Sequence, residues 1–262
     1  MWPTWWRRWQ ARRQERVLQS RPIPDPLWHA VLDQFPFLRQ RAPGDVDELR
    51  RLATLFLDRK EFTGAGGLTI TDEMAVAIAA QACLPVLKLG LHLYDDFVGI
   101  VVHPDEVVAR REVMDEDGVV HRYDEVLAGE AMDRGPVMLS WRDVREAGAG
   151  AEGAYNVVIH EFVHKLDMQD GESDGVPPLP PAARAAWIDV IDAEFERFCT
   201  DVDEGRETFL DPYGAQGCDE FFAVAAEAFF VAPLAFRAEH PALYEQFKSY
   251  FRQDPAATAD SP

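Results

Sequence analysis

Hydrophobic residues recur at helical spacing early in the chain. Asp45 and Glu48 have the spacing of a capping box, which predicts the start of a helix at this point. That helix would carry four apolar residues on one face, namely Leu49, Leu52, Leu55 and Phe56. Residues 72–84 are alanine-rich and apolar on nearly every side, so we expect a buried helix that Pro85 ends or kinks.

The middle of the chain changes to a pattern typical of β-strands. Residues 97–103 form a β-branched run, and residues 136–141 are expected to form another strand. Residues 107–113 and 119–124 flank an Asp-Gly pair at 117–118, which is a strong hairpin signal. We therefore expect a small mixed sheet in this part of the chain.

Helical spacing returns from residue 152 onward. One helix is expected through His164, followed by helices over residues 182–200, 219–231 and 241–252. Helices, then a small sheet, then more helices predict an α+β fold. The chain has no run of about 18 apolar residues, so no membrane span is expected.

Chain length and composition suggest a division into three segments. A chain of 262 residues fits one large domain, which we place at residues 27–252 with short helical segments over residues 27–34. Before it, residues 1–26 combine a basic, Trp/Arg-rich helix with a proline-rich linker that begins at Arg21. Residues 253–262 are expected to be a C-terminal tail.

The charge of the chain is strongly negative. The formal net charge is −20, and such a surface repels phosphate backbones, so no direct nucleic-acid binding is expected. Residues 1–21 are the exception, since six arginines against one glutamate give +5. We expect the tryptophans of this segment to dock on the domain rather than on a membrane. Three widely spaced cysteines (Cys83, Cys199 and Cys218) indicate neither disulfides nor a thiolate zinc site, which favours a reducing compartment.

His160, Glu161 and His164 form an HExxH motif. On a helix the two histidines lie one turn apart on one face, so both imidazoles can bind one zinc ion. Glu161, next to the first ligand, can take a proton from a zinc-activated water. Apolar residues surround the triplet on both sides, and three polar side chains would be costly to bury there without partners. The motif therefore predicts a catalytic zinc site.

A catalytic zinc ion normally has a third protein ligand, and four carboxylates are candidates. Asp170 has the spacing of the extended HExxHxxGxxH pattern, but Asp167 stands where that pattern has glycine, and Asp167 itself fits a supporting hydrogen bond better. Glu220 and Glu227 share one face of an otherwise apolar helix, where a carboxylate must be paired or bound to metal. We favour Glu220 as the ligand and Glu227 as its support, because Glu220 lies near the helix start, where substrate can enter.

Tyr213 lies seven residues before Glu220, just outside the same helix. Its phenol could stabilise the oxyanion that forms when water attacks a peptide carbonyl, and the alternative is a tyrosine that only packs. The serines show no Gly-x-Ser-x-Gly pattern, so a serine hydrolase is not indicated.

Several blocks of the chain together resemble a known family. They are residues 83–90, 155–167, 173–177, 211–213, 219–230 and 251–255. In these blocks the chain resembles the Mlc titration factor A family of zinc metallopeptidases. The order of the HExxH block, Tyr213 and the Glu220 block is also similar to the anthrax lethal factor protease domain.

This resemblance implies a zincin-like fold and one Zn²⁺ per chain. It implies His160, His164 and Glu220 as zinc ligands, Glu161 as general base and Tyr213 as a helper of the transition state. It further implies a cytoplasmic peptidase with aminopeptidase-like activity on small substrates. Enteric relatives bind a glucose-responsive transcriptional repressor, so such a partner is a further expectation. The long, basic N-terminal segment departs from the family pattern.

Two functions of different classes remain open from the sequence. In the first, the protein is a zinc peptidase in which Glu161 deprotonates water, and the peptide lies along the strand at 136–141 as on an edge. In the second, it is a non-catalytic regulatory protein that sequesters a partner, and its zinc is structural or vestigial. An intact Glu161 favours the enzyme, because a purely structural site needs no general base.

Overall fold

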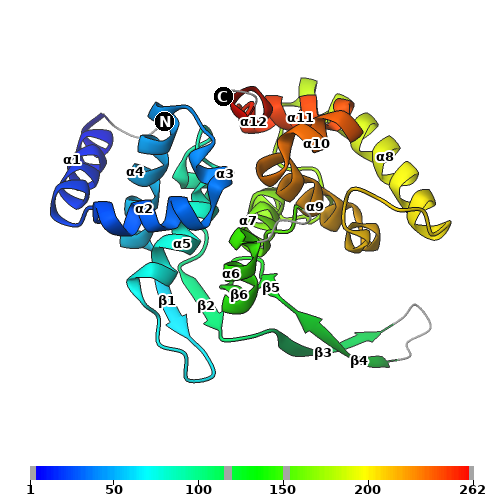
Figure 1. The fold of residues 1–262 in the computed structure, drawn as a ribbon, viewed down its shortest axis with the longest axis horizontal. Coiled ribbons are helices and arrows are strands. Elements are labelled where there is room, and N and C mark those ends of the chain that lie inside the picture. The colour runs from blue at the N-terminus through cyan, green and yellow to red at the C-terminus, as the bar shows by residue number, and fades with distance from the viewer. Residues whose placement is uncertain (1–3, 115–119, 150–153, 260–262) are drawn as a thin grey trace.

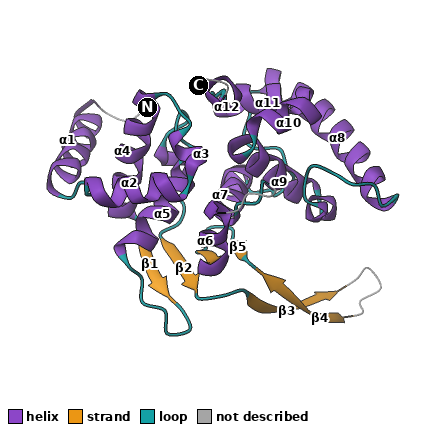
Figure 2. Cartoon of the chain, viewed as in Figure 1, coloured by secondary structure: helices purple, strands orange, loops and turns teal. Residues whose placement is uncertain are grey.

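The computed structural model describes residues 4–114, 120–149 and 154–259, and it is mixed α+β with helices predominating (Figures 1 and 2). The α-helices are α1 (Thr4–Ser20), α2 (Asp25–Gln34), α3 (Pro36–Arg39), α4 (Pro43–Arg59), α5 (Asp72–Cys83), α6 (Trp141–Ala149), α7 (Val157–Asp167), α8 (Pro181–Asp203), α9 (Cys218–Val231), α10 (Pro233–Glu239), α11 (Pro241–Phe251) and α12 (Pro255–Ala259). Three 3-10 helices are η1 (Leu91–Tyr94), η2 (Met168–Asp170) and η3 (Pro212–Gln216). The strands are β1 (Glu61–Gly64), β2 (Gly99–His103), β3 (Val107–Met114), β4 (Val120–Leu127), β5 (Gly129–Ala131) and β6 (Val137–Ser140).

The main sheet has four strands in the order β1-β2-β6-β5. The first three are parallel, and Ile100 of β2 lies opposite Phe62 on one side and Val137 on the other. β5 pairs antiparallel with β6 at the edge of the sheet. The prediction that the strand at 136–141 offers an edge was therefore wrong, because β5 covers it. β5 has only three residues and begins with Gly129, which leaves too little alternation to predict a strand.

The predicted hairpin is present as β3 and β4. These strands pair antiparallel from Val107 opposite Leu127 to Met114 opposite Val120. The Asp-Gly pair at 117–118 that predicted the turn lies outside the described residues. The hairpin projects from the body of the molecule next to β5 (Figure 1).

α7 occupies the centre of the molecule. Helices α1–α5 lie on one side of it and α8–α12 on the other, while the sheet lies below in the view of Figure 1. Its Phe162 packs among Tyr94, Phe56 and Phe97 at ring-centroid distances of 5.2 to 5.9 Å. α5 contacts α7 and is buried along most of its length, as its alanine-rich sequence predicted. Burial of these apolar residues holds α7 against the N-terminal half of the fold.

Proline sets the start of many helices. It stands at the first or second helical position of α2, α3, α4, α8, α10 and α11, where its missing N–H costs little. The predicted capping box was wrong, since α4 begins at Pro43 and has no side-chain cap. Asp45 instead forms an ion pair with Lys88, and Glu48 pairs with Arg51 at 2.7 Å.

The first and last described helices, α1 and α12, both pack on the body of the protein. α1 lies along α4 and places Val17 and Leu18 against the core, while Trp9 is exposed. The side chains of the other N-terminal tryptophans lie outside the described residues. At the C-terminus, the segment expected as a tail forms α12, and Gln253 donates a hydrogen bond to the Leu84 carbonyl oxygen at 2.9 Å.

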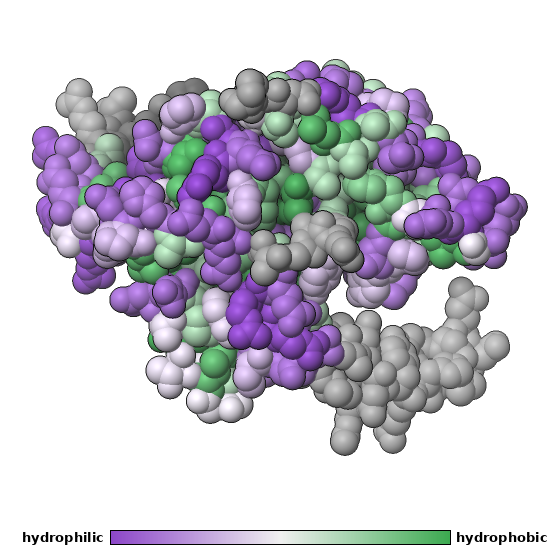
Figure 3. Space-filling view, in the orientation of Figure 1, coloured by the Kyte–Doolittle hydropathy of each residue, from purple (hydrophilic) through white to green (hydrophobic). Residues whose placement is uncertain are grey.

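The exterior matches the composition of the chain. The face shown in Figure 3 is hydrophilic around most of its outline, as the net charge of −20 predicts. Within the described part of the chain, none of the helices has the length and apolarity needed to cross a bilayer.

Candidate metal centre

Asn156 defines the start of α7, the helix that carries the HExxH motif. Its side-chain oxygen accepts a hydrogen bond from the Ile159 N–H at 2.9 Å, which is an N-cap. Its side-chain amide donates to Gln81 on α5 at 2.7 Å. Every residue from Val157 to Asp167 is buried, so the polar side chains of this helix depend on partners inside the protein.

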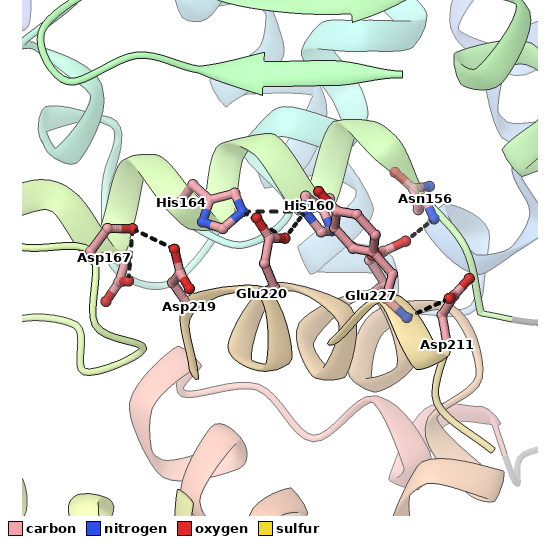
Figure 4. A network of polar contacts seen from close by, with 10 residues as sticks. Asn156, His160, His164, Asp167, Asp211, Asp219, Glu220 and Glu227 are labelled. Atoms are coloured by element: carbon pink, nitrogen blue, oxygen red, sulfur yellow. Dashed lines mark hydrogen bonds and ion pairs between the residues drawn. The ribbon is translucent and has the colours of Figure 1, made fainter. Parts of the chain in front are cut away.

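Those partners come from α9, which runs beside α7 (Figure 4). His160 and His164 project from one face of α7 toward Glu220. The distance from His160 Nε2 to Glu220 Oε2 is 2.9 Å, and the distance from His164 Nε2 to the same oxygen is 3.4 Å. The two Nε2 atoms are 3.2 Å apart. One ligand atom from each of three residues therefore faces a common point.

This triangle of atoms suits a zinc ion. Zn–N and Zn–O bonds of about 2.05 Å in a tetrahedron place neighbouring ligand atoms about 3.3 Å apart. The three observed separations, 2.9, 3.2 and 3.4 Å, cluster around that length. Two imidazoles and one carboxylate also match the ligand chemistry of catalytic zinc sites, which leave a further position open.

Glu227 lies on the far side of His160 from this triangle. Its Oε1 is 2.8 Å from His160 Nδ1, and its Oε2 accepts a hydrogen bond from the backbone N–H of Asn156. The side chain of Glu227 is 3% exposed, whereas that of Glu220 is 21% exposed. The more exposed carboxylate, Glu220, thus faces Nε2 of both histidines. The more buried one, Glu227, contacts His160 at Nδ1 on the opposite side of its ring.

The charges in the centre influence one another strongly. Burial would lower the pKa of His160, but hydrogen bonds to Glu220 and Glu227 raise it well above its usual value. Burial would also raise the pKa of Glu220, yet the two histidines hold it at about 2. Both effects show that this site stabilises positive charge beside an ionised carboxylate.

Glu161 lines a cavity of about 380 Å³ that His160 and Glu227 also line. Burial raises the pKa of Glu161, although the neighbouring histidines oppose the shift. Gly129 of β5 lies directly against this side chain. A β-carbon on Gly129 would lie only 2.5 Å from Glu161 Oε1, so the close approach requires glycine.

Tyr213 lies at the mouth of the same cavity, on η3. Asp211 fixes the start of this short helix, since its Oδ1 accepts a hydrogen bond from the Tyr213 N–H at 2.9 Å. The exposed ring of Tyr213 is 6.0 Å from the ring of His160, measured between centroids. Two residues that lie 53 positions apart in sequence are thus brought together.

The other two ligand candidates lie outside the triangle. Asp170 is exposed on η2, with Arg184 at 3.8 Å. Asp167 is buried and accepts a hydrogen bond from the Gly175 N–H at 2.9 Å, and burial raises its pKa to about 6. Asp167 therefore anchors the loop after α7 to the end of that helix, close to His164.

Sequence reasoning missed Asn156 and Gly129. An asparagine directly before an apolar helical run is a known N-cap signal and could have been recognised. Gly129 gave no such signal, because its role depends on β5 lying over α7, which is a tertiary contact.

Comparison with known proteins identifies a metallopeptidase family. Residues 6–252 match the family described as glucose-regulated metallo-peptidase M90. The chain is 36% identical over 244 residues to the uncharacterized protein slr2042 of Synechocystis sp., an alignment that covers 92% of this chain and 88% of that protein. It is 36% identical over 222 residues to Mlc titration factor A of Serratia proteamaculans, covering 82% and 84%. Mlc titration factor A of Klebsiella pneumoniae is 35% identical over 231 residues, covering 87% and 86%.

Proposed function

The chain belongs to the glucose-regulated metallo-peptidase M90 family, and from this premise we propose that it is a zinc-dependent peptidase with Glu161 as general base. The observation that carries the proposal is the convergence of His160 Nε2, His164 Nε2 and Glu220 Oε2 beside a cavity that contains Glu161. We assign these three residues as the zinc ligands. A bound zinc ion supplies a Lewis acid, which polarises a carbonyl group and lowers the pKa of water.

The residues of the chain perform the proton transfers and the positioning. Glu161 accepts a proton from the attacking water and passes it to the leaving amine; its raised pKa suits both steps. Glu227 holds the His160 ring through Nδ1, so that Nε2 stays directed at Glu220. The hydroxyl of Tyr213 donates to the oxyanion of the tetrahedral intermediate.

The edge of the sheet offers a place for the peptide. β5 is the edge strand of the sheet within the described residues and lies over α7, so an extended peptide can pair with it next to Glu161. This arrangement of an HExxH helix beneath an edge strand is what we mean by a zincin-like fold, with residues 27–252 as the catalytic domain. We place the enzyme in the cytoplasm, where reduced cysteines are expected.

The name of the relatives favours a second, regulatory role. Mlc titration factor A denotes a protein that titrates Mlc. We therefore propose a transcriptional repressor as a protein partner of this chain as well. The strict alternative is a non-catalytic protein that sequesters this partner and holds a structural zinc ion.

Metal analysis combined with a peptide-library digest tests the proposal. The purified protein should contain about one zinc per chain, and cleavage should stop with a chelator and return when zinc is added. Cuts one residue from the N-terminus would establish aminopeptidase action, and internal cuts endopeptidase action. A full complement of zinc without cleavage of any library member would support the non-catalytic alternative instead.

A further inference from the structure

The cavity beside Glu161 extends to a second group of side chains that the reaction does not use. Asp143 of α6 and Tyr155, just before α7, line it together with the catalytic residues. The side chains of Glu161, Tyr213 and Asp143 thus line one open cavity beside the proposed zinc centre.

The lining of this cavity is acidic. Among the described residues that line it, five are Asp or Glu and none is Lys or Arg. Four of the five acids have an assigned partner or role: Glu106 pairs with Arg142, Asp211 caps η3, Glu227 holds His160, and Glu161 is the proposed base. Asp143 is the remaining one.

Asp143 is buried without a full set of hydrogen-bond partners. Asp143 is only 7% exposed, and its Oδ2 has no hydrogen-bond partner among the residues that the structure describes. Its Oδ1 is 3.5 Å from the Tyr155 hydroxyl, which is a long contact. The next cation along the helix, Arg142, is occupied by Asp105 at 2.6 Å and by Glu106. A buried carboxylate left in this state is costly, which points to a ligand that completes its hydrogen bonds.

Local structure explains how Asp143 is held in place but leaves that oxygen without a donor. Ser140 is the last residue of β6 and directly precedes α6. The hydroxyl of Ser140 accepts a hydrogen bond from the backbone N–H of Asp143 at 3.4 Å. The helix N-terminus stabilises the negative charge there. The negative charge of the cavity also affects Tyr155. Burial raises the pKa of its hydroxyl, and the carboxylates of Asp143, Glu227 and Glu161 raise it further.

We propose that Asp143 and Tyr155 form a substrate pocket that binds a protonated amine of the peptide. The amine is either the N-terminal ammonium group or the ammonium group of a lysine side chain. Asp143 accepts its hydrogen bonds, and the exposed ring of Tyr155 covers it through a cation–π contact. The inference rests on the proposed peptidase function, because the pocket and Glu161 share one cavity.

Matched quenched peptides test the pocket with the zinc-loaded, full-length protein. One set replaces each lysine by norleucine, and the other acetylates the N-terminus. We expect kcat/KM to fall about 10-fold or more when the recognised amine is removed, and Asp143→Asn to abolish that difference. Loss through acetylation identifies the N-terminal amine, and loss through norleucine identifies the side chain. Glu146→Gln is the matched control, since it removes an exposed acid from the same helix and should keep the wild-type preference.

Two further measurements keep failure of the pocket distinct from failure of the enzyme. If wild type cleaves none of the peptides, the proposed function fails, and their affinities measured by fluorescence anisotropy still test Asp143. Equal preference for the charged peptides in wild type and Asp143→Asn, by rate or by affinity, overturns the pocket. So does a fall in melting temperature with unchanged preference, because that result assigns the carboxylate a structural role. We expect the melting temperature to stay the same or to rise, since the substitution removes an incompletely bonded buried charge.

Discussion

Glu227 and His160 are joined by a hydrogen bond of 2.8 Å between carboxylate Oε1 and imidazole Nδ1. A carboxylate at Nδ1 favours the tautomer with its proton there, which would leave the lone pair of Nε2 available to a zinc ion held between His160, His164 and Glu220. The other oxygen of Glu227 accepts a hydrogen bond from the backbone N–H of Asn156, the N-cap of α7. One buried carboxylate thus fixes both the start of the active-site helix and the direction of its first histidine.

This relationship predicts an order of zinc affinities among three variants. Glu220→Ala removes a metal bond and should show the largest loss. Glu227→Gln keeps the shape but weakens the support of His160, so we expect about 10–100-fold weaker binding. Asp170→Ala should bind zinc as wild type does, because Asp170 lies outside the triangle. Competition with a chelator measures all three, and wild-type affinity in Glu220→Ala would show that the ligand is a different residue.

Glu161→Gln should keep zinc and lose peptidase activity. The substitution preserves the size of the side chain but removes the base that accepts the proton from water. A general base contributes about 10²–10⁴-fold, and we expect kcat to fall by that factor with the zinc content unchanged. Full turnover by the variant would assign the proton transfer to another group.

Gly129→Ala should lower activity without touching a metal ligand. The added β-carbon would meet Glu161 Oε1 at 2.5 Å and must displace that side chain or β5. A shift of about 1 Å in a catalytic group can cost about 10²-fold in rate. Gly44→Ala is the control, because nothing lies within 4 Å of the added atom. Zinc affinity and kcat are measured for both variants. If Gly129→Ala turned over as fast as Gly44→Ala, Glu161 would not lie against Gly129 during catalysis.

Lys60 should make stability depend on pH in alkaline solution. It is buried, donates to the carbonyl oxygens of Tyr94 and Phe97, and burial lowers its pKa to about 8. In the unfolded chain the pKa of lysine is near 10.4. Between these values the unfolded state binds more protons, so the Lys60 contribution to the free energy of unfolding rises with pH, by up to about 1.4 kcal/mol per unit.

Denaturant unfolding of wild type and Lys60→Met between pH 7.5 and 10.5 measures this contribution. The difference in free energy of unfolding between the two proteins should change in favour of wild type as the pH rises. Lys88→Met, which removes an exposed lysine, serves as the control. A constant difference between wild type and Lys60→Met would mean that Lys60 stays charged in the folded protein throughout this range.

The local patterns of the sequence predicted most helices and the hairpin, but not the order of the strands. Helical spacing locates α5 and α9 to within one residue, because each buries apolar residues along most of its length. α7 begins at Val157, five residues after the expected start at 152, because Asn156 caps it there. β1 and β5 are three or four residues long and were not predicted. Their existence depends on pairing with β2 and β6, which no local pattern encodes.

The candidate site shows the same limit. The HExxH spacing depends only on helix geometry, and Glu220 could be favoured over Glu227 because it lies near the start of their shared apolar helix. The roles of Gly129 and Asp143 depend on which elements meet at the cavity. Both residues lie next to the ends of short strands, where the sequence pattern is weakest.

Tyr213→Phe is the sharpest test of how the cavity serves the reaction. Tyr213 lies at the mouth of the cavity with its ring 6.0 Å from that of His160, so its hydroxyl can meet charge that develops beside the zinc site. If the hydroxyl contacts only the transition state, kcat should fall by about 10²-fold while KM and zinc affinity stay near wild type. Tyr250→Phe is the control, because it removes a phenol that packs on Trp187 outside the cavity. A Tyr213→Phe enzyme with wild-type kcat would reduce Tyr213 to a packing residue, and a change in KM alone would assign it to substrate binding.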